Sequence, residues 1–481
     1  MSPAPEVHAQ SWIDDTETPV SAFLKLRAAA PGEPAFLLES AERGRVGRYS
    51  FLGHRPHATL RWCLGDPGDP YALAQAALDA AAPDRAPQSD TPLPPFTGGA
   101  VGMFAYDLVR TREPSLGPPP NPDPLGTPDL ALMLTDTLVV FDHLQHRITV
   151  LAHRFADEPE GAAEAKIAGV RKVLGGALPP AGTRAGRSGA PAGRSDGAAP
   201  APPTFRSNHT REQFEANVAA IIELIRAGDA YQVVPSQRWS AACPVSAFSV
   251  YRGLRAVNPS PYMYFLDFGD FQVVGASPEP LVTVHGERVS TTPIAGTRPR
   301  GASAEEDARI AAELLADPKE RAEHVMLVDM GRNDIGRVSR YGSVHVDDFM
   351  VVENYSHVMH IVSNVSGRLA PDVSALDALA AVLPVGTLSG APKVRAMEII
   401  DELEPVKRGG YGGAIGYVSY DGDLDTCVHI RTAVIKDGEI HIQAGGGTVA
   451  DATPANEYEE SLNKSQALRA AVEVALAQGW E

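Results

Sequence analysis

Positive charge is scarce in this chain of 481 residues. Its 42 Lys and Arg residues stand against 60 Asp and Glu residues, which gives a formal net charge of -18 at pH 7. General affinity for nucleic acids depends on clustered basic side chains that neutralise phosphates. The sequence therefore predicts no nucleic-acid partner. An anionic substrate would need local positive charge, from a metal ion or from a few placed Arg and Lys side chains.

Long apolar runs are missing and cysteine is rare. Hydrophobic residues make up 44% of the chain, but no run approaches the roughly 18 apolar residues of a membrane span. The first fifteen residues lack the basic and then apolar regions of a secretory signal. Three widely spaced cysteines, Cys63, Cys243 and Cys427, form neither a disulfide framework nor a zinc pattern. These absences predict a cytoplasmic protein without a membrane partner.

Composition divides the chain into three parts. Residues 1–175 mix short apolar runs with turns and are predicted to form an α+β region with much antiparallel pairing. Within this region, residues 131–154 are expected to form two strands joined by a turn near His143. Residues 176–204 consist almost wholly of Gly, Ala, Pro, Ser and Arg, which predicts a flexible linker without a packed core. Residues 205–481 form the third part.

Helices and strands alternate in this third part. Thr210 precedes apolar residues at helical spacing and is expected to cap a long helix. Further helices are expected over residues 374–383 and from Pro454 to the end of the chain. Arg431 is expected within a strand, HIRTAVI, where its apolar neighbours predict burial.

Two pairs of glutamates stand out, because each pair is spaced by three residues in a predicted helix. Glu320 and Glu323 lie at the head of one helix, and Glu457 and Glu460 precede Lys464 in the other. Residues at this spacing share one helix face. Paired carboxylates facing one cleft suit a hard cation such as Mg²⁺ and, through it, an anionic substrate. The alternative is that these are ordinary solvated glutamates.

Other candidate residues are individually ambiguous. Arg431 could clamp a substrate carboxylate or form a structural ion pair. His360, in VMHIVSNV, could carry a proton or be a satisfied core residue. Glycine-rich turns could let backbone N–H groups approach an anion, but none has the sequence of a phosphate loop, which argues against a nucleotide-dependent phosphotransferase. These turns cover residues 296–298, 386–393, 410–413 and 444–448.

A set of motifs in a fixed order resolves this ambiguity, because together the motifs resemble those of a known enzyme family. In chain order the motifs are SPEPL, PIAGTRPRG, AEHVMLVDMGRND, VMHIVSNVSG, PVGTLSGAPK, GGYGGAIGY, TCVHIR, AGGGTVADATP and EYEESLNK. Together they resemble the chorismate-utilising enzymes and, within that family, the large aminating subunits of anthranilate synthases. The resemblance implies an α+β fold of antiparallel sheets packed as a sandwich, flanked by helices, with intertwined subdomains. It implies a catalytic region at 205–481.

The implied activity converts chorismate and ammonia to anthranilate and pyruvate. This is the first committed step of tryptophan biosynthesis. The resemblance implies a Mg²⁺ cofactor with Glu323 and Glu460 as direct ligands and Glu320 and Glu457 in support. Glu279 matches the acid that assists departure of the ring hydroxyl, and His360 is expected to help the later loss of pyruvate.

Substrate-binding positions are implied in the same way. Arg431, Tyr411 and the backbone of Gly445, Gly446 and Gly447 are expected to hold the pyruvyl carboxylate. Gly296, Thr297, Thr387 and Lys464 match positions that contact the substrate, and Thr387 and Lys464 are also expected to take part in catalysis.

Two positions separate the branches of the family. Ala295 stands where aminodeoxychorismate synthases of the common type carry a nucleophilic lysine, and alanine cannot form that covalent intermediate. Gln232 stands where isochorismate and salicylate synthases carry a lysine that activates water, and glutamine cannot serve as that base. Both positions favour ammonia as the nucleophile. The alternatives are an aminodeoxychorismate synthase that lacks the lysine and a non-catalytic relative that senses tryptophan.

The resemblance also implies regulation and a partner. The segments LLES and NPSPYMYF resemble a site at which tryptophan acts as a feedback inhibitor. The matching positions are Glu39, Ser40, Pro261, Tyr262, Met263 and Gly275. The alternative for these residues is a strand end packing on a turn. The sequence has no glutaminase motif, so ammonia from glutamine would require a separate amidotransferase subunit.

Overall fold

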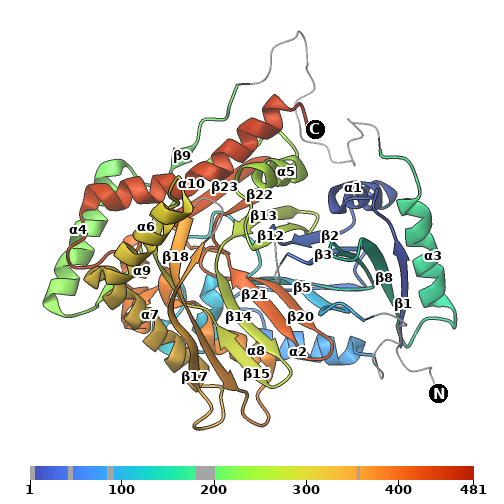
Figure 1. Ribbon diagram of the computed structural model, residues 1–481, viewed down its shortest axis with the longest axis horizontal. Helices are drawn as coiled ribbons and strands as arrows, with labels where there is room; N and C mark the ends of the chain where they lie inside the picture. The colour runs from blue at the N-terminus through green and yellow to red at the C-terminus, as the bar shows by residue number, and fades with distance from the viewer. Residues whose placement is uncertain (1–5, 42–46, 84–91, 180–200, 355–357, 481) are drawn as a thin grey trace.

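The computed structural model describes residues 6–41, 47–83, 92–179, 201–354 and 358–480. Within these ranges the chain forms two large antiparallel β-sheets with helices on their outer faces (Figure 1). Packing two sheets face to face buries one face of each, and the helices cover the other faces. The predicted α+β class is confirmed.

The first sheet mixes strands from both ends of the chain. In order across the sheet, they are β1 (Glu6–Ile13), β8 (Arg147–Arg154), β7 (Thr137–Asp142), β3 (Tyr49–His54), β2 (Ala35–Glu39), β12 (Tyr262–Asp267), β13 (Phe271–Ser277), β22 (Thr432–Lys436), β23 (Glu439–Gly445), β11 (Ser236–Ala242) and β9 (Arg206–Ser207).

The second sheet is mixed in the same way. In order across the sheet, its strands are β16 (Ile294–Pro299), β18 (Val358–Arg368), β15 (Arg288–Thr291), β14 (Pro280–His285), β21 (Leu424–Val428), β20 (Ala414–Ser419), β5 (Gly99–Phe104), β6 (Leu130–Leu134) and β4 (Ala58–Trp62). β17 (His345–Asn354) also pairs with β18, and β10 (Gln232–Val233) pairs separately with β19 (Gly390–Ala391).

Both predicted regions contribute strands to both sheets. In the first sheet β2 pairs with β12, which sets Glu39 opposite Met263. In the second sheet β5 pairs with β20, which sets Phe104 opposite Ala414. Residues 1–175 and 205–481 are therefore intertwined rather than stacked as separate layers.

Helices of varied length connect the strands. They are α1 (Pro19–Ala29), α2 (Pro70–Ala81), α3 (Ala162–Leu174), α4 (Arg211–Ala227), α5 (Ala247–Val257), α6 (Ala304–Ala316), α7 (Pro318–Gly336), α8 (Ala375–Val382), α9 (Lys393–Leu403) and α10 (Pro454–Ala477), with 3₁₀ turns η1 (Tyr106–Thr111), η2 (Pro114–Leu116) and η3 (Gly386–Leu388).

The core has three main layers. Between the sheets, Phe51 and Leu266 of the first sheet join Met103 and Ile415 of the second in one buried cluster. A second cluster packs α1, α3, α5 and α10 on the outer face of the first sheet, and a third packs α2, α7 and α8 on the outer face of the second. In Figure 1, α5 and α10 lie above the sheets and α2 and α8 lie below them. Burial of these apolar faces is the main stabilising term.

Local signals fix where the long helices begin. The side chain of Thr210 accepts a hydrogen bond from the backbone N–H of Gln213 and forms a capping box at the start of α4. Asp317 caps α7, and Pro318 occupies its first position. The predicted helices from Thr210, over residues 374–383 and from Pro454 are confirmed, with the last beginning at Pro454 itself.

Two expectations about strands are wrong. Residues 131–154 form three strands, because the apolar run breaks at Thr135 and Asp136, where the chain passes from β6 in the second sheet to β7 in the first. The Thr135 Oγ1 accepts from the N–H of Gly99, 2.9 Å away, and Lys166 Nζ lies 2.6 Å from Asp136. Arg431 precedes β22 rather than lying within a strand, and its φ of 51° is left-handed.

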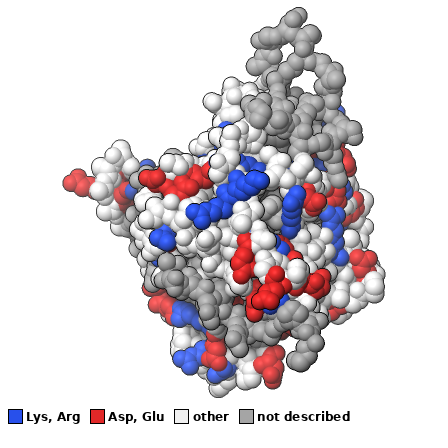
Figure 2. All heavy atoms as spheres, turned by 90° about the vertical axis from the view of Figure 1, so that its right-hand side faces the viewer, with Lys and Arg blue, Asp and Glu red and all other residues white. Residues whose placement is uncertain are grey.

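Most of the predicted linker, 176–204, falls outside the described residues. Among the helices that are described, none has both the length and the hydropathy needed to cross a membrane. Figure 2 shows the face on the side of α3 and β1, where acidic and basic side chains are interspersed over the visible described surface.

Candidate active site

The first glutamate pair lies on α7. The Asp317 side chain accepts hydrogen bonds from the backbone N–H groups of Lys319 and Glu320, at 2.9 and 3.3 Å. This cap starts the helix so that Glu320 and Glu323 follow one above the other on one face. Arg298 Nη1 donates to Glu320 Oε1 across 2.9 Å, which holds this carboxylate toward β16.

The second pair lies on α10 and meets a turn that has no room for a side chain. A Cβ atom on Gly446 would stand 2.7 Å from Glu457 Oε2 and 3.2 Å from the carboxyl carbon of Glu460. A residue with a Cβ atom there would force both carboxylates to move from these positions. Lys464, one turn further along α10, pairs with Glu460 at 2.6 Å. The glycine-rich turn at 445–447 and the second glutamate pair are therefore one structure.

Electrostatics link the two pairs. The pKa of Glu457 is raised to about 7, mainly by burial and also by the neighbouring carboxylates of Glu460 and Glu323, while Lys464 and Lys319 oppose the shift. Burial also raises the pKa of Glu323, with Glu320 and Glu460 adding to the shift. The carboxylates of α7 and α10 therefore repel one another across the gap between the two helices. Such mutual repulsion is typical of a site that lacks its counter-charge.

The four glutamates offer the kind of donors that a Mg²⁺ ion needs. Among the described residues, none donates a hydrogen bond to the buried Oε2 of Glu457, and the donor set is made of carboxylate oxygens, which Mg²⁺ prefers. Within the same ranges, no three Asp, Glu, His or Cys side chains already stand in a ligating group. Glu320 and Glu460 instead face Arg298 and Lys464. The chemistry of the donors fits the ion, and binding would require small side-chain shifts.

The raised pKa of Glu457 gives a stability prediction for the metal-free protein. The folded state holds a proton up to about pH 7, whereas the unfolded carboxyl releases it near its ordinary pKa of 4.5. The group therefore favours folding at low pH and disfavours it as pH rises through this window. In EDTA, Glu457→Gln should raise Tm by roughly 3 °C at about pH 8 and by much less at about pH 5. Equal shifts at both pH values, measured by calorimetry, would contradict the assignment.

Arg431 lies beside the second pair and is half-buried. Its Nη1 donates to the backbone carbonyl of Lys464 across 3.1 Å. Burial lowers its pKa, and Tyr411 and Glu460 lie close enough to offset part of that shift. No ion pair of Arg431 is found within the described residues. Lys464 Nζ donates in turn to the carbonyl of Gly445, 2.9 Å away. A half-buried guanidinium that bonds no carboxylate among the described residues suits an incoming carboxylate.

Glu279 lies between β13 and β14 and is held by a hydroxyl. Thr387 Oγ1 donates to Glu279 Oε1 across 2.6 Å. Burial raises the pKa of Glu279 to about 7, although the Thr387 hydrogen bond and Lys464 oppose the shift. A carboxyl with this pKa is protonated in a large fraction of molecules near neutral pH. It can therefore act as a general acid.

His360 on β18 contacts Gly296 and Thr297, which lie at a bulge within strand β16 rather than in the turn predicted over residues 296–298. Its Nδ1 lies 3.1 Å from the carbonyl oxygen of Gly296 and 3.1 Å from Thr297 Oγ1. A carbonyl only accepts, so this contact places the ring proton on Nδ1 and a lone pair on Nε2. Burial lowers the pKa of His360, which keeps the ring neutral at pH 7. Gly296 adopts a φ of 63° and faces Glu320, so β16 connects His360 to the first glutamate pair.

Gln232 joins these groups from β10. Its Nε2 donates to Glu323 Oε1 across 3.3 Å, and it leaves Gly447 no space for a Cβ atom, which would lie 2.4 Å away. Its Oε1 is buried and accepts no hydrogen bond from any described residue. The structure thus brings the predicted metal, substrate and catalytic positions into one site.

The six predicted tryptophan-binding positions form a separate group, with Glu39, Tyr262, Met263 and Gly275 on three neighbouring strands and Ser40 and Pro261 next to the strand ends. Glu39 stands opposite Met263, and Gly275 stands opposite Tyr264, the residue next to Met263. The carboxylate of Glu39 already accepts from Tyr251 and from Arg255 Nε, 3.0 Å away. Tyr262 donates to Asp425 of the second sheet across 3.0 Å. Ser40 Oγ is buried and has no hydrogen-bond partner among the described residues.

Sequence reasoning missed the partner of Glu320. Arg298 bonds both Glu320 and Asp317, the capping residue of α7, and so fixes the head of this helix. Arg298 stands two residues after Gly296 in the sequence. This neighbourhood indicated that the segment around Gly296 would contact α7. Nothing in the sequence pattern, however, indicated which of the nearby acids it would contact.

Comparisons with known proteins agree with this geometry. The family model described as chorismate binding enzyme matches residues 33–470. The chain is 49% identical to anthranilate synthase component 1 of Pseudomonas putida, over 96% of this chain and 94% of that protein. It is 48% identical to anthranilate synthase component 1 of Thermus thermophilus, over 98% of each.

A solved structure is also similar. The crystal structure of anthranilate synthase component I from Streptococcus pneumoniae superposes with a TM-score of 0.77 and 39% sequence identity. The alignment covers 89% of this chain and 93% of that one. The residues matched by the family model, 33–470, include both glutamate pairs.

Proposed function

This chain belongs to the family of chorismate binding enzymes, and we propose that it is the aminating subunit of an anthranilate synthase. The reaction converts chorismate and ammonia to anthranilate and pyruvate for tryptophan biosynthesis. Relatives named anthranilate synthase component 1 match nearly the whole chain at 48 to 49% identity. The designation component 1 further supports a partner subunit, which we propose to be a glutamine amidotransferase that supplies ammonia.

The observation that carries the specific activity is the amide at Gln232. This side chain is 3% exposed and bonds Glu323 within the site. A lysine there could take a proton from water, but an amide cannot. Ammonia needs no such base, because its neutral form is already a nucleophile. Ala295, buried on β16, likewise offers no amine for a covalent intermediate. Both residues support direct addition of ammonia.

Binding is assigned to the cationic and glycine-rich side of the site. The guanidinium of Arg431, the hydroxyl of Tyr411 and the backbone of Gly445 to Gly447 would hold the pyruvyl carboxylate, with Lys464 beside them. The ring would lie toward Gly296, Thr297 and Thr387. Mg²⁺, when bound by Glu323 and Glu460 with Glu320 and Glu457 in support, would neutralise the ring carboxylate and act as a Lewis acid toward it.

Two proton transfers complete the reaction. As ammonia adds at ring carbon two, Glu279 donates its proton to the departing ring hydroxyl, which leaves as water. His360, neutral because burial lowers its pKa, then accepts the proton from ring carbon two as the bond to the pyruvyl oxygen breaks. Aromatisation of the ring drives this elimination. The departing enolpyruvate takes up a proton at its methylene carbon to become pyruvate, and the amino nitrogen releases the extra proton that it gained on addition, so the products are anthranilate, pyruvate and water.

Product analysis tests the proposal. The purified chain is incubated with chorismate, Mg²⁺ and an ammonium salt, and anthranilate is followed by its fluorescence while pyruvate is measured by a coupled dehydrogenase. Equal amounts of both products, abolished by EDTA, are expected. Amination without pyruvate release would instead identify an aminodeoxychorismate synthase. No consumption of chorismate would identify a non-catalytic relative.

We also propose that tryptophan binds near Ser40 and inhibits the enzyme. The buried, unpartnered hydroxyl of Ser40 is the structural support for this proposal. Ser40→Phe would fill the space beside it and weaken inhibition by at least roughly tenfold, equivalent to about 1.4 kcal/mol. The measurement is a tryptophan titration of both proteins, in which their uninhibited rates should agree. Full activity of the unaltered enzyme in millimolar tryptophan would refute the regulatory site.

A further inference from the structure

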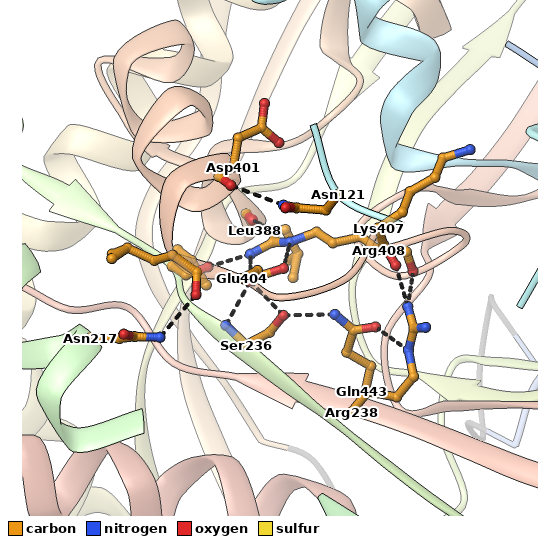
Figure 3. A network of polar contacts seen from close by, with 12 residues as sticks. Asn121, Asn217, Ser236, Arg238, Leu388, Asp401, Glu404, Lys407, Arg408 and Gln443 are labelled. Atoms are coloured by element: carbon orange, nitrogen blue, oxygen red, sulfur yellow. Dashed lines mark hydrogen bonds and ion pairs between the residues drawn. The ribbon is translucent and has the colours of Figure 1, made fainter. Parts of the chain in front are cut away.

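Directly behind the site lies a buried network that the activity itself does not explain (Figure 3). Its centre is Arg408, which is 3% exposed and pairs with Glu404, four residues earlier in the sequence. Arg408 Nε donates to Glu404 Oε2 across 2.9 Å, and its Nη2 donates to Oε1. Taking such a pair out of water costs free energy, and apolar side chains of the same volume are often as stabilising. Stability alone therefore does not explain this buried ion pair, and the positions that it fixes give a better explanation.

The remaining donors of Arg408 point at the segments that carry the site. Nη1 donates to the carbonyl of Leu388 and Nη2 to the carbonyl of Val234, both across 2.6 Å. Leu388 directly follows Thr387, which bonds Glu279. Val234 follows β10, which carries Gln232. One planar guanidinium thus fixes the backbone of two separate loops.

The same guanidinium also supports an aromatic ring of the site. Its carbon lies 5.4 Å from the ring centroid of Tyr411 and 4.7 Å from that of Tyr106. Contacts of this kind are attractive because the ring face is electron-rich. Tyr411 is itself 7% exposed, so this neighbour restricts where its hydroxyl can lie.

The network is anchored to the first sheet. Glu404 Oε1 accepts from the backbone N–H and the hydroxyl of Ser236 on β11, at 2.9 and 2.8 Å. Gln443 on β23 donates to Ser236 Oγ across 2.8 Å and accepts from Arg238 across 3.0 Å. Figure 3 shows these side chains converging from the sheet toward Arg408. β23 leads directly into the Gly445–Gly447 turn. The first sheet therefore holds this turn and the segments bonded by Arg408 in fixed positions relative to one another.

We infer that Arg408 is a positioning residue that sets Thr387, Gln232 and Tyr411 in register for chorismate. It touches none of the reacting atoms. Only the forked geometry of arginine can serve a carboxylate and two carbonyls at once, whereas lysine offers a single point of charge. The inference rests on the proposed function only in naming chorismate as the ligand.

The test compares Arg408→Lys with a matched control, Arg110→Lys. Arg110 is equally buried, pairs with Asp107 and Asp401, and donates to the carbonyls of Leu116 and Gly117, none of which belongs to the site. Both variants should lose thermal stability. Chorismate binding is measured by calorimetry in Mg²⁺ without ammonia, so that no amination occurs, at a temperature where circular dichroism shows both variants folded.

We expect Arg408→Lys to weaken chorismate binding by roughly 10- to 100-fold, and Arg110→Lys to change it by less than about twofold. Equal affinities in the two folded variants would overturn the inference. If Arg408→Lys does not fold, Glu404→Gln replaces it, since this change keeps the shape but loosens the grip on Arg408, and a loss of at least about threefold is then required. If the unaltered chain binds chorismate but forms no anthranilate, the proposed function fails while this comparison still stands.

Discussion

Replacing Glu323 by glutamine should lower Mg²⁺-dependent turnover by at least about 100-fold and leave the fold intact. The change removes one carboxylate from the cluster formed by α7 and α10 and leaves the Gln232 contact in place. Burial raises the pKa of Glu323, so the metal-free protein should be as stable as the unaltered one, or more so. The measurements are a Mg²⁺ titration of the rate and of binding heat, with Tm in EDTA.

Asp329→Asn provides the control for this change. It removes the same charge from the same helix, but the Asp329 side chain is 75% exposed and pairs only with Arg332 in the contacts described. Exposed pairs of this kind contribute little. Its Mg²⁺ dependence should match that of the unaltered enzyme. Turnover of Glu323→Gln within about threefold of the unaltered rate would remove Glu323 from the list of ligands.

Glu279→Gln should lower kcat by roughly 10² to 10⁴-fold while changing the KM for chorismate little. The amide keeps the shape and the Thr387 contact but has no acidic proton to give. Burial raises the pKa of Glu279 to about 7, and the protonated form is the active one. The rate should therefore fall as pH rises through about 7, when the concentration of free ammonia is held constant.

The pH profile distinguishes this role from a structural one. In Glu279→Gln the residual rate should lose the decline above pH 7. Glu398→Gln, which alters an exposed carboxyl on α9, should retain both the rate and the decline. A profile of Glu279→Gln that keeps the same alkaline limb would assign that limb to another group and leave Glu279 without a role as acid.

The helices were more predictable than the sheets, for a physical reason. Thr210, Asp317 and Pro454 determine helix starts through contacts within three residues, so the sequence carries the signal locally. Sheet partners are chosen by burial across the whole molecule. β5 and β20 pair although hundreds of residues separate them, and no periodicity identifies such a partner. The break at Thr135 and Asp136 was hidden because the apolar residues on both sides fit one continuous strand.

The residues of the site divide in the same way into those that the local sequence predicts and those whose role depends on the whole fold. The glutamates could be predicted because their spacing and their motifs are visible in the linear sequence. Arg298 and Arg408 could not be assigned, because their roles depend on which carboxylates and carbonyls surround them after folding. The left-handed backbone of Arg431 likewise has no sequence signature, since a non-glycine residue rarely adopts it.

The interleaved sheets also mean that strands made early in synthesis must wait for partners that are made late. Phe104 of β5 pairs with Ala414 of β20, which is synthesised 310 residues later, or roughly 15 to 60 s at bacterial elongation rates. Throughout that interval the apolar early strands have an open edge on which other nascent chains could pair. Neither sheet can close until most of the polypeptide has emerged. Production of this protein should therefore depend strongly on chaperones that hold unfinished chains, and slower growth at low temperature should increase its soluble yield.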